Sequence, residues 1–564
     1  MRSKTGNTPE TELSRRKFLG AGLALSAGAL ALPAHAFPAV HTPAIRAAGN
    51  ATSSTSSSAP DFELEEITVA QLQDAMASGK WTARSIAEKY LARIAEIDTQ
   101  GPALNSVIEL NPEALAIADS LDAERKSKGP RGPMHGIPVL IKDNIGTSDR
   151  MMTSAGSLAL SGNIPPKDSG VARQLRAAGA VILGKTNLSE WANFRSSHSS
   201  SGWSGRGGQT RNPYALDRNP CGSSSGSGAA VSANLCAVTV GSETDGSIVC
   251  PSSANGVVGI KPTVGLVSRA GIVPISHSQD TAGPICRTVA DAAALLTALA
   301  GEDPDDSASA ASRGKISADY TKFLDRSGLR GARIGVVRKF FDMSEKLSPL
   351  MDSALDAMKR EGAVLVDPVE IDSVGKFDEA ELEVMYYEFK ADLNAYLSKY
   401  APSARVHSLA DIIAFNEQNH ARELQFFGQD IMTKSQAKGP LTEKAYIDAR
   451  EKSLRLAGKE GIDAAMDLHK LDALLAPTAG PAWVTDLVNG DHDSGGSSSL
   501  AAVAGYPNIN VPAGFIFGLP VGISFFGRAW SEPALIKIAY AFEQATRARQ
   551  TPKFLGSADL YAGA

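Results

Sequence analysis

Cysteine is scarce in this sequence, with four residues among 564, at positions 221, 236, 250 and 286. So few cysteines in so long a chain exclude a small secreted domain held together by a disulfide framework. Their positions show no Cys-x-x-Cys spacing, which leaves a structural zinc site without support. We expect Cys250 to be a small packing residue rather than a nucleophile.

Long apolar runs and positive charge are also lacking. Beyond the first 36 residues no stretch approaches 18 uninterrupted apolar residues, so we expect no stable membrane insertion of the mature protein. The formal net charge is −5, and residues 1–36 hold five basic and two acidic side chains, which leaves −8 on the remainder. An acidic body lacks the basic footprint that displaces counterions from DNA or RNA, so a nucleic-acid partner is excluded.

The first 36 residues have the features of an export signal. Arg15 and Arg16 form a twin-arginine pattern, and the apolar residues 18–32 that follow have no polar face and are too short to span a bilayer. Ala-His-Ala at residues 34–36 supplies a small-x-small cleavage site. We therefore expect a twin-arginine signal peptide cleaved after Ala36, the twin-arginine export machinery as a partner of the precursor, and a periplasmic or secreted mature protein.

The rest of the chain divides into a short linker and one large body. Residues 37–60 are largely Ala, Ser, Thr and Pro and are expected to form a flexible tether. No second linker of this kind follows, so residues 61–564 are expected to be one domain. Its alternating elements predict an α/β fold with strands buried on both faces and a helical cap in residues 371–470. Strands are expected at 107–110, 137–141, 181–183, 473–475, 509–511 and 521–525, and helices after the Thr68/Gln71 capping box, after Thr82 and at 168–178.

The most unusual window is residues 222–228, Gly-Ser-Ser-Ser-Gly-Ser-Gly. Such small residues cannot pack a core, and an apolar stretch follows, so a turn that leads backbone N–H groups into a helix start fits best. A phosphate-binding loop is an alternative, but the Gly-Lys-Ser/Thr signature is absent. The window also matches a Gly-x-Ser-x-Gly nucleophile elbow centred on Ser224, although residues 212–220 before it are turn-like rather than a strand.

Two other windows carry chemistry. In residues 238–248 a β-branched strand runs into a glycine-containing turn that ends on Ser247, where consecutive N–H groups can converge as an oxyanion hole requires. In residues 136–144 an apolar strand delivers Lys142 at its carboxyl end. The ordinary interpretation is a lysine that marks the strand exit, but burial there would lower its pKa and free the amine to act as a base.

Together these windows resemble the amidase signature family. The resemblance rests on residues 136–144, 184–190, 222–228, 243–248 and 256–263, in the family's order and spacing, and extends from about residue 67 to the end. One departure is informative. Asp245-Gly246-Ser247 stands where the family usually has two glycines before the nucleophile, and the arginine usual two residues after it is missing. This variant resembles the bacterial peptide amidases.

The resemblance implies a fold and a site. The fold would be a large mixed central β-sheet flanked by helices on both faces, with a helical cap region. Ser247 would be the nucleophile, Ser223 the bridging residue and Lys142 the base. The backbone N–H groups of Thr244, Asp245 and Gly246, with that of Ser247, would bind the oxyanion. No metal ion or organic cofactor is required by this chemistry.

The implied activity is hydrolysis of carboxamides to acid and ammonia through an acyl-enzyme, with C-terminal peptide amides as the expected substrates. The alternatives are the A-type glutaminase component of a tRNA-dependent amidotransferase, which would need cytosolic partners, and an amidase of small aliphatic or aryl amides. An α/β-hydrolase esterase would depend on Ser224 and one histidine. A periplasmic binding protein on an inactive amidase scaffold is disfavoured, because all three catalytic positions are filled.

Several residues are set aside as structural. The histidines show no metal-ligand spacing and are expected on the surface or hydrogen-bonded in the core. Lys185 and Lys261 are expected to be structural. Four aromatic residues could line a substrate cleft, although core packing is the default for each: Trp203, Tyr386, Phe426 and Trp483.

Overall fold

A computed structural model describes residues 61–560 of the chain. The twin-arginine signal, its cleavage point after Ala36 and the tether at residues 37–60 lie outside the described residues. They therefore stay predictions from the sequence, as does the site of action outside the cytoplasm.

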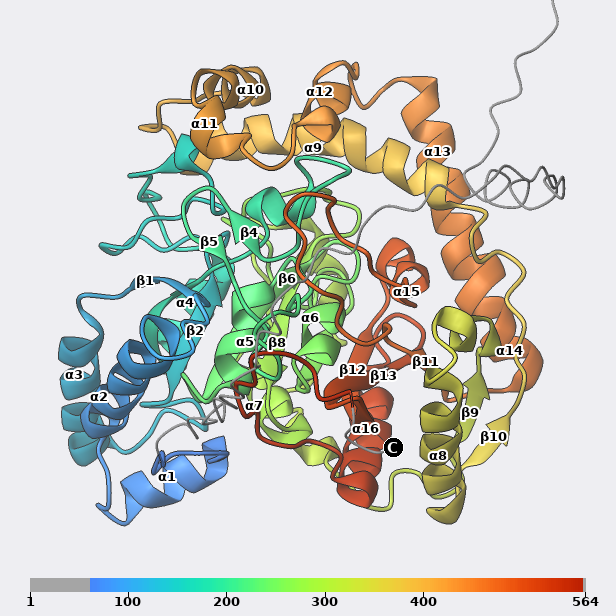
Figure 1. Ribbon diagram of the computed structural model, residues 1–564. Helices are drawn as coiled ribbons and strands as arrows, with labels where there is room; N and C mark the ends of the chain where they lie inside the picture. Colours follow the sequence, from blue (N-terminus) through green and yellow to red (C-terminus); the bar gives the residue numbers. More distant parts are fainter. Residues whose placement is uncertain (1–60, 561–564) are drawn as a thin grey trace, which may run out of the picture. The chain divides into compact units, whose positions relative to one another are not determined.

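The core of the described region is one mixed β-sheet of eleven strands (Figure 1). Its order is β1-β3-β2-β6-β8-β7-β12-β13-β11-β9-β10, with β4 and β5 forming a separate two-stranded ribbon. The pairs β2/β3, β2/β6, β9/β10 and β9/β11 are parallel, and the other neighbours in the large sheet are antiparallel. The strands are β1 Val107–Leu110, β2 Pro138–Lys142, β3 Val181–Thr186, β4 Trp203–Ser204, β5 Gly208–Gln209, β6 Val238–Glu243, β7 Val258–Lys261, β8 Thr281–Cys286, β9 Arg333–Val336, β10 Val364–Val366, β11 Ala473–Pro477, β12 Asn508–Ile516 and β13 Leu519–Phe526.

Helices cover the sheet and form a separate cap. Every residue of β2, β3, β6 and β8 is buried, so both faces of the central sheet are covered, as expected for this α/β fold. Helices α5 and α6 pack together against the sheet, and α4, α7 and α16 form another packed set. The α-helices are α1 Val69–Ala77, α2 Ala83–Arg93, α3 Ala114–Lys128, α4 Gly170–Ala177, α5 Ser225–Ser232, α6 Val249–Ala254, α7 Val289–Leu299, α8 Leu347–Arg360, α9 Asp378–Tyr400, α10 Leu409–Gln418, α11 His420–Glu423, α12 Asp430–Gln436, α13 Lys444–Leu454, α14 Ala464–His469, α15 Ser499–Ala504 and α16 Glu532–Thr546.

Most elements expected from the sequence are present within a few residues. The capping box is formed as predicted: the Gln71 backbone N–H donates to the Thr68 hydroxyl, and the Thr68 backbone N–H donates to the Gln71 side chain. β8 was not anticipated, although it lies in the centre of the sheet. Its Pro284 pairs with Val240 of β6, and a proline normally argues against a central strand because it cannot donate to the ladder.

Residues 378–469 form the helical cap, within the region 371–470 that was expected to be helical. Helices α9 to α13 lie in a layer of their own, at the top of Figure 1. Arg195 anchors this layer, because its buried guanidinium pairs with Glu190 and also donates to the carbonyl oxygens of Glu423 and Phe427. The cap is therefore tied to the sheet domain by a fully buried charge network.

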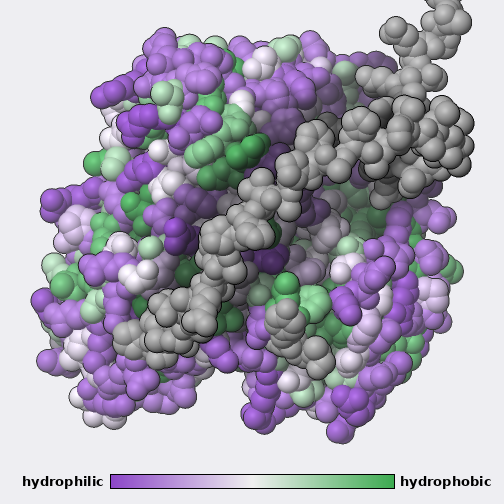
Figure 2. Space-filling view, in the orientation of Figure 1, coloured by the Kyte–Doolittle hydropathy of each residue, from purple (hydrophilic) through white to green (hydrophobic). Residues whose placement is uncertain are grey.

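The face of the molecule seen in Figure 2 is mainly hydrophilic. Figure 2 shows polar residues over most of the visible face, interrupted by separate apolar patches. Within residues 61–560 no helix has both the length and the apolar character that crossing a bilayer requires.

Candidate active site

The site lies at the carboxyl ends of two interior strands of the central sheet. Strands β2 and β6 are parallel neighbours, with Ile141 paired to Val240, so their carboxyl ends meet at the same edge. β2 ends on Lys142, and β6 runs directly into the turn that carries Ser247. Ser223 reaches the same place from the turn before α5. Three segments far apart in the sequence thus converge on one point.

Lys142 is fully buried and lies against a serine. Its Nζ is 2.8 Å from Ser223 Oγ, 3.0 Å from Ser242 Oγ and 3.2 Å from the Ser242 carbonyl oxygen. Burial lowers the pKa of Lys142 to about 7, although the negative charges of Asp280 and Glu243 act in the opposite direction. A substantial fraction of the amine is therefore neutral at physiological pH and able to accept a proton.

The two serines lie on adjoining turns. Ser223 is fully buried, and the peptide bond between Gly222 and Ser223 is cis. Ser247 is 7% exposed, and its carbonyl oxygen accepts a hydrogen bond from the backbone N–H of Ser224. Within residues 61–560 the Ser247 hydroxyl makes no hydrogen bond to the protein. The structure thus joins Lys142 to Ser223 directly and brings Ser247 next to them through the backbone.

The turn before Ser247 has the features of an anion-binding element. The backbone N–H groups of Thr244, Asp245, Gly246 and Ser247 donate to no acceptor in the part of the chain that the structure describes. Glu243 closes the turn, because its carboxylate accepts hydrogen bonds from the backbone N–H groups of Ile248 and Val249. A pre-positioned set of free N–H groups beside a serine can stabilise a tetrahedral oxyanion.

Three polar residues that support this site were not assigned from the sequence. Ser242 contacts Lys142 and also accepts a hydrogen bond of 2.8 Å from the side-chain amide of Asn144. The Thr244 hydroxyl donates to Asp280, whose carboxylate lies just before β8. Burial raises the pKa of Asp280 to about 6. Ser242 and Asn144 stand inside the sequence windows that carry the chemistry, so their positions could have marked them as site residues. Their roles, however, depend on side-chain contacts that only the folded structure shows.

One expectation about cysteine is wrong. Cys250 is not a packing residue but forms a disulfide with Cys221, with their Cα atoms 6.0 Å apart. Cys221 is two residues before Ser223 and Cys250 is three residues after Ser247, so the bond links the turns that carry the two serines. The sequence separation of 29 did not suggest a pair, because the two turns approach each other only in the folded sheet. Cys236 and Cys286 are free and buried.

Removing this disulfide should affect both stability and activity. We expect the double variant Cys221→Ala/Cys250→Ala to lose about 2–4 kcal/mol of unfolding free energy, the usual range for a native cross-link. Its kcat should fall because the two serine turns lose their covalent link. Denaturant unfolding and steady-state kinetics check this. Dithiothreitol should lower the stability and kcat of the wild type in the same way and leave the double variant unchanged. Equal kcat in the untreated wild type and the double variant would contradict the expectation.

The cleft beside the serines has a volume of about 210 Å³. Gly222 and Gly246, which precede Ser223 and Ser247, form part of its wall together with both cysteines of the disulfide. Of the aromatic residues considered from the sequence, Trp483 lines this cleft. Trp203 instead packs against Phe426, and Tyr386 packs against Phe194.

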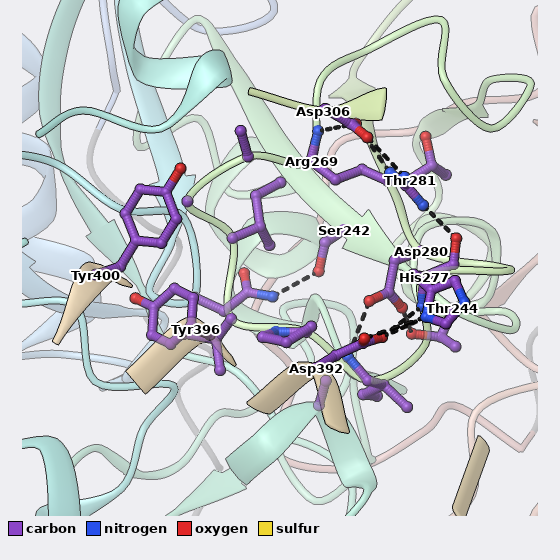
Figure 3. A pocket seen from close by; sticks show the side chains of 18 of the residues that line it. Ser242, Thr244, Arg269, His277, Asp280, Thr281, Asp306, Asp392, Tyr396 and Tyr400 are labelled. Atoms are coloured by element: carbon purple, nitrogen blue, oxygen red, sulfur yellow. Dashed lines mark hydrogen bonds and ion pairs between the residues drawn. The ribbon is translucent and has the colours of Figure 1, made fainter. Parts of the chain in front are cut away.

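A second cavity of about 260 Å³ reaches the polar partners of Lys142 (Figure 3). Asn144, Ser242 and Thr244 line it together with Tyr396 and Tyr400 of α9. Several of its charged groups are paired with one another: Figure 3 shows Arg269 joined to Asp306 and His277 joined to Asp392.

His277, Glu388 and Asp392 are close enough to hold a metal ion, with possible ligand atoms within 4.8 Å of one another. However, the Glu388 carboxylate already accepts hydrogen bonds from the hydroxyls of Ser276, Ser278 and Tyr446. The cluster is thus satisfied by protein donors.

Other residues named in the sequence analysis have structural surroundings. The Ser224 hydroxyl donates to the Ser242 carbonyl oxygen at 3.0 Å and is fully buried, so it does not form the exposed elbow of an α/β-hydrolase. Lys185 donates to the carbonyl oxygen of Ile145, and Lys261 to that of Tyr506. His135 lies in the core, with its ring against the Leu121 carbonyl oxygen.

Comparison with known proteins agrees with this geometry. The family model named Amidase matches residues 85–536. The solved structure of native peptide amidase from Stenotrophomonas maltophilia is 54% identical, with a TM-score of 0.84, and the match covers 88% of this chain and 100% of that one. A probable amidase of Arabidopsis thaliana is 45% identical over 503 residues, which cover 88% of this chain and 93% of the relative.

The A-type component of the glutamyl-tRNA(Gln) amidotransferase of Thermoanaerobacter pseudethanolicus is similar at a lower level, 32% identical over 88% of this chain and 100% of the relative. The family model spans most of the chain, and the relatives match it over nearly their whole length. The mixed sheet, the helices around it and these matches lead to one conclusion: the chain belongs to the amidase signature family and is an amide hydrolase.

Proposed function

We propose that this enzyme releases ammonia from the C-terminal carboxamide of peptides, with Ser247 as nucleophile, Ser223 as proton relay and Lys142 as base. The observation that carries the proposal is the contact of 2.8 Å between the buried Lys142 amine and Ser223 Oγ. A serine hydroxyl is a weak nucleophile at neutral pH, and a base of lowered pKa within reach of it removes that limitation.

In the first half-reaction the neutral Lys142 amine takes the proton of the Ser223 hydroxyl, and Ser223 takes the proton of Ser247. The Ser247 oxygen attacks the carboxamide carbon and forms a tetrahedral oxyanion. This oxyanion would be bound by the free N–H groups of Thr244, Asp245, Gly246 and Ser247. Each such donor typically lowers the barrier by about 3–4 kcal/mol.

The carbon–nitrogen bond then breaks, and the nitrogen leaves as ammonia with a proton returned from Lys142 through Ser223. The product at this point is an ester between Ser247 and the peptide carboxyl group. A water molecule, which gives a proton to the same relay, hydrolyses the ester. The peptide acid leaves, and Ser247 regains its hydroxyl proton.

Peptide amides are favoured over glutamine by the comparisons. The peptide amidase of Stenotrophomonas maltophilia is 54% identical to this chain, whereas the amidotransferase component is 32% identical. The variant Asp245-Gly246-Ser247 motif supports the same choice, because it departs from the wider family at the residues next to the nucleophile.

A competition assay tests the proposed substrate. Purified enzyme is given a C-terminal peptide amide, glutamine or a simple aliphatic amide at equal concentration, and ammonia is measured. We expect the highest kcat/KM for the peptide amide, with release by the Ser247→Ala variant at background for all three. Preference for glutamine would favour the glutaminase alternative, and preference for the aliphatic amide would favour an amidase of small amides.

A further inference from the structure

The walls of the cleft beside the two serines are unusual in charge. Three of the residues that line it are acidic, Asp245, Asp491 and Asp493, and no lysine, arginine or histidine is among them. None of the three forms an ion pair with a cation of residues 61–560, although ion pairs occur throughout the rest of that region.

The second cavity shows the contrast. It is also rich in acidic residues, but there Asp306 pairs with Arg269 and Asp392 pairs with His277 (Figure 3). Asp305 pairs with Lys167 and Lys399. Three acidic groups of that cavity are thus paired with basic side chains, whereas Asp280 and Glu243 on its wall form no ion pair with the described residues. In the cleft beside the serines, none of the three acidic groups forms an ion pair with the described residues, and none of the described residues on its wall is basic. The two cavities therefore differ in the basic side chains that face their acidic groups.

The partners of Asp491 orient its charge without cancelling it. Its carboxylate accepts hydrogen bonds from the Trp483 indole N–H at 3.0 Å, from the backbone N–H of Ser201 at 2.8 Å and from the Asn219 amide at 3.2 Å. All three donors are neutral. Burial, with a smaller contribution from the charge of Asp493, raises the pKa of Asp491 above its ordinary value.

Asp245 contributes a further negative charge next to the nucleophile. One of its carboxylate oxygens accepts a hydrogen bond of 2.6 Å from the Ser499 hydroxyl, and Glu381 of α9 approaches the same side chain. Burial and the charge of Asp245 raise the pKa of Glu381 well above its usual range. Glu381 is therefore protonated more readily than an ordinary glutamate.

We infer that the cleft selects cationic substrates, namely peptide amides that carry a lysine, an arginine or a free amino group close to the carboxamide. The inference rests on the proposed function. A cleft lined by charges of one sign between low-dielectric walls concentrates the opposite charge and speeds its association, commonly by about 10- to 1000-fold at low ionic strength. Asp245, Asp491 and Asp493 share this cleft with Gly222 and Gly246, so a charge near the reacting amide would interact with all three.

The test uses three N-acetylated tripeptide amides that differ only in the middle residue, which is lysine, glutamine or glutamate. For each, kcat/KM is measured by ammonia release in about 0.01 M salt and again in about 1 M salt, where the screening length falls from about 30 Å to about 3 Å. We expect the order lysine, glutamine, glutamate at low salt, with roughly tenfold or more between the extremes. At high salt the three values should converge.

Two variants localise the effect. Asp493 is exposed and can be changed without disturbing the core, so Asp493→Asn should lower the lysine-to-glutamate ratio about threefold at low salt, a moderate part of the steering expected from a one-sign cleft. The matched control is Asp356→Asn on α8, which makes the same change in net charge at an exposed residue outside the cleft and should leave the ratio unchanged.

Each outcome bears on one of the two proposals. Equal kcat/KM for the three peptides at low salt, or a preference for glutamate, would overturn the inference while leaving peptide amide hydrolysis intact. A lysine preference that persists in 1 M salt would also overturn it, since a screened electrostatic effect cannot do so. If no peptide releases ammonia while glutamine or a simple amide does, the proposed function fails, and the inference fails with it.

Discussion

Replacing Ser247 with alanine should lower kcat for a peptide amide by about 10⁴-fold or more, the scale reached when a hydrolase loses its nucleophile. The physical reason is that no acyl-enzyme can form without the Ser247 hydroxyl. Fold should be retained, because within residues 61–560 this hydroxyl makes no hydrogen bond to the protein. Ammonia release under single-turnover conditions and the circular dichroism spectrum together check the result.

A matched control separates loss of the nucleophile from loss of a buried serine. Ser435 of α12 is fully buried, and its hydroxyl has no partner within the described residues, so Ser435→Ala makes the same chemical change far from the sheet edge. It should keep wild-type kcat. Full activity in Ser247→Ala, with Ser435→Ala equally active, would mean that another residue attacks the amide.

The second large effect concerns Lys142. Lys142→Met should lower kcat by about 10²- to 10⁴-fold, the usual contribution of general acid–base catalysis. The wild type should also show an acid limb near pH 7, since burial lowers the pKa of Lys142 to about 7 and only the neutral amine accepts a proton. Activity should therefore fall as the pH drops below 7, and the residual activity of the variant should lack this limb.

The same substitution should raise stability. A pKa lowered from 10.5 in the unfolded chain to about 7 in the folded protein means that the unfolded state binds the proton more tightly between these values. The stability of the wild type therefore rises with pH across this window, and the full cost of the buried charge is present below pH 7. Because each pKa unit corresponds to about 1.4 kcal/mol, Lys142→Met should be more stable than the wild type by a few kcal/mol at pH 6 and by much less at pH 10.

Lys185 is the control for both measurements. It is equally buried, and burial lowers its pKa to about 8, but it contacts the Ile145 carbonyl oxygen and the Thr153 hydroxyl rather than a serine of the site. Lys185→Met should keep the acid limb near pH 7. If Lys142→Met keeps that limb as well, the base must be another group.

Much of the site could be predicted from the sequence, because its residues stand in short contiguous motifs. A glycine- and serine-rich turn before a helix, and a β-branched strand that runs into Ser247, are patterns that local backbone preferences favour. Lys142 at the end of an apolar strand belongs to the same kind of signal. The resemblance to the amidase signature family then implied that these windows form one site. The sheet explains how they meet, because β2 and β6 are parallel neighbours and their carboxyl ends lie side by side.

Other features could not be predicted, since each depends on chain segments that meet only after folding. β8 carries Pro284 and glycine and lacks the pattern of a strand, yet it is held between β6 and β7 in the sheet. The lowered pKa of Lys142 needs the complete burial that this side chain has only in the folded protein. Asp245, Asp491 and Asp493 likewise come to share one cleft, with no basic side chain among the described residues that line it, only when distant parts of the sequence meet.

The scarcity of cysteine is the clearest case of this division. The sequence by itself determined that no disulfide framework holds this fold together, because four cysteines cannot replace the large apolar core of an α/β sheet. It also determined which residues of the chain could do the chemistry. Only the tertiary structure decided that Cys221 and Cys250 meet, because disulfide formation depends on the distance between two Cα atoms in space, and the turns that carry the two serines come together only when β2, β6 and α5 pack.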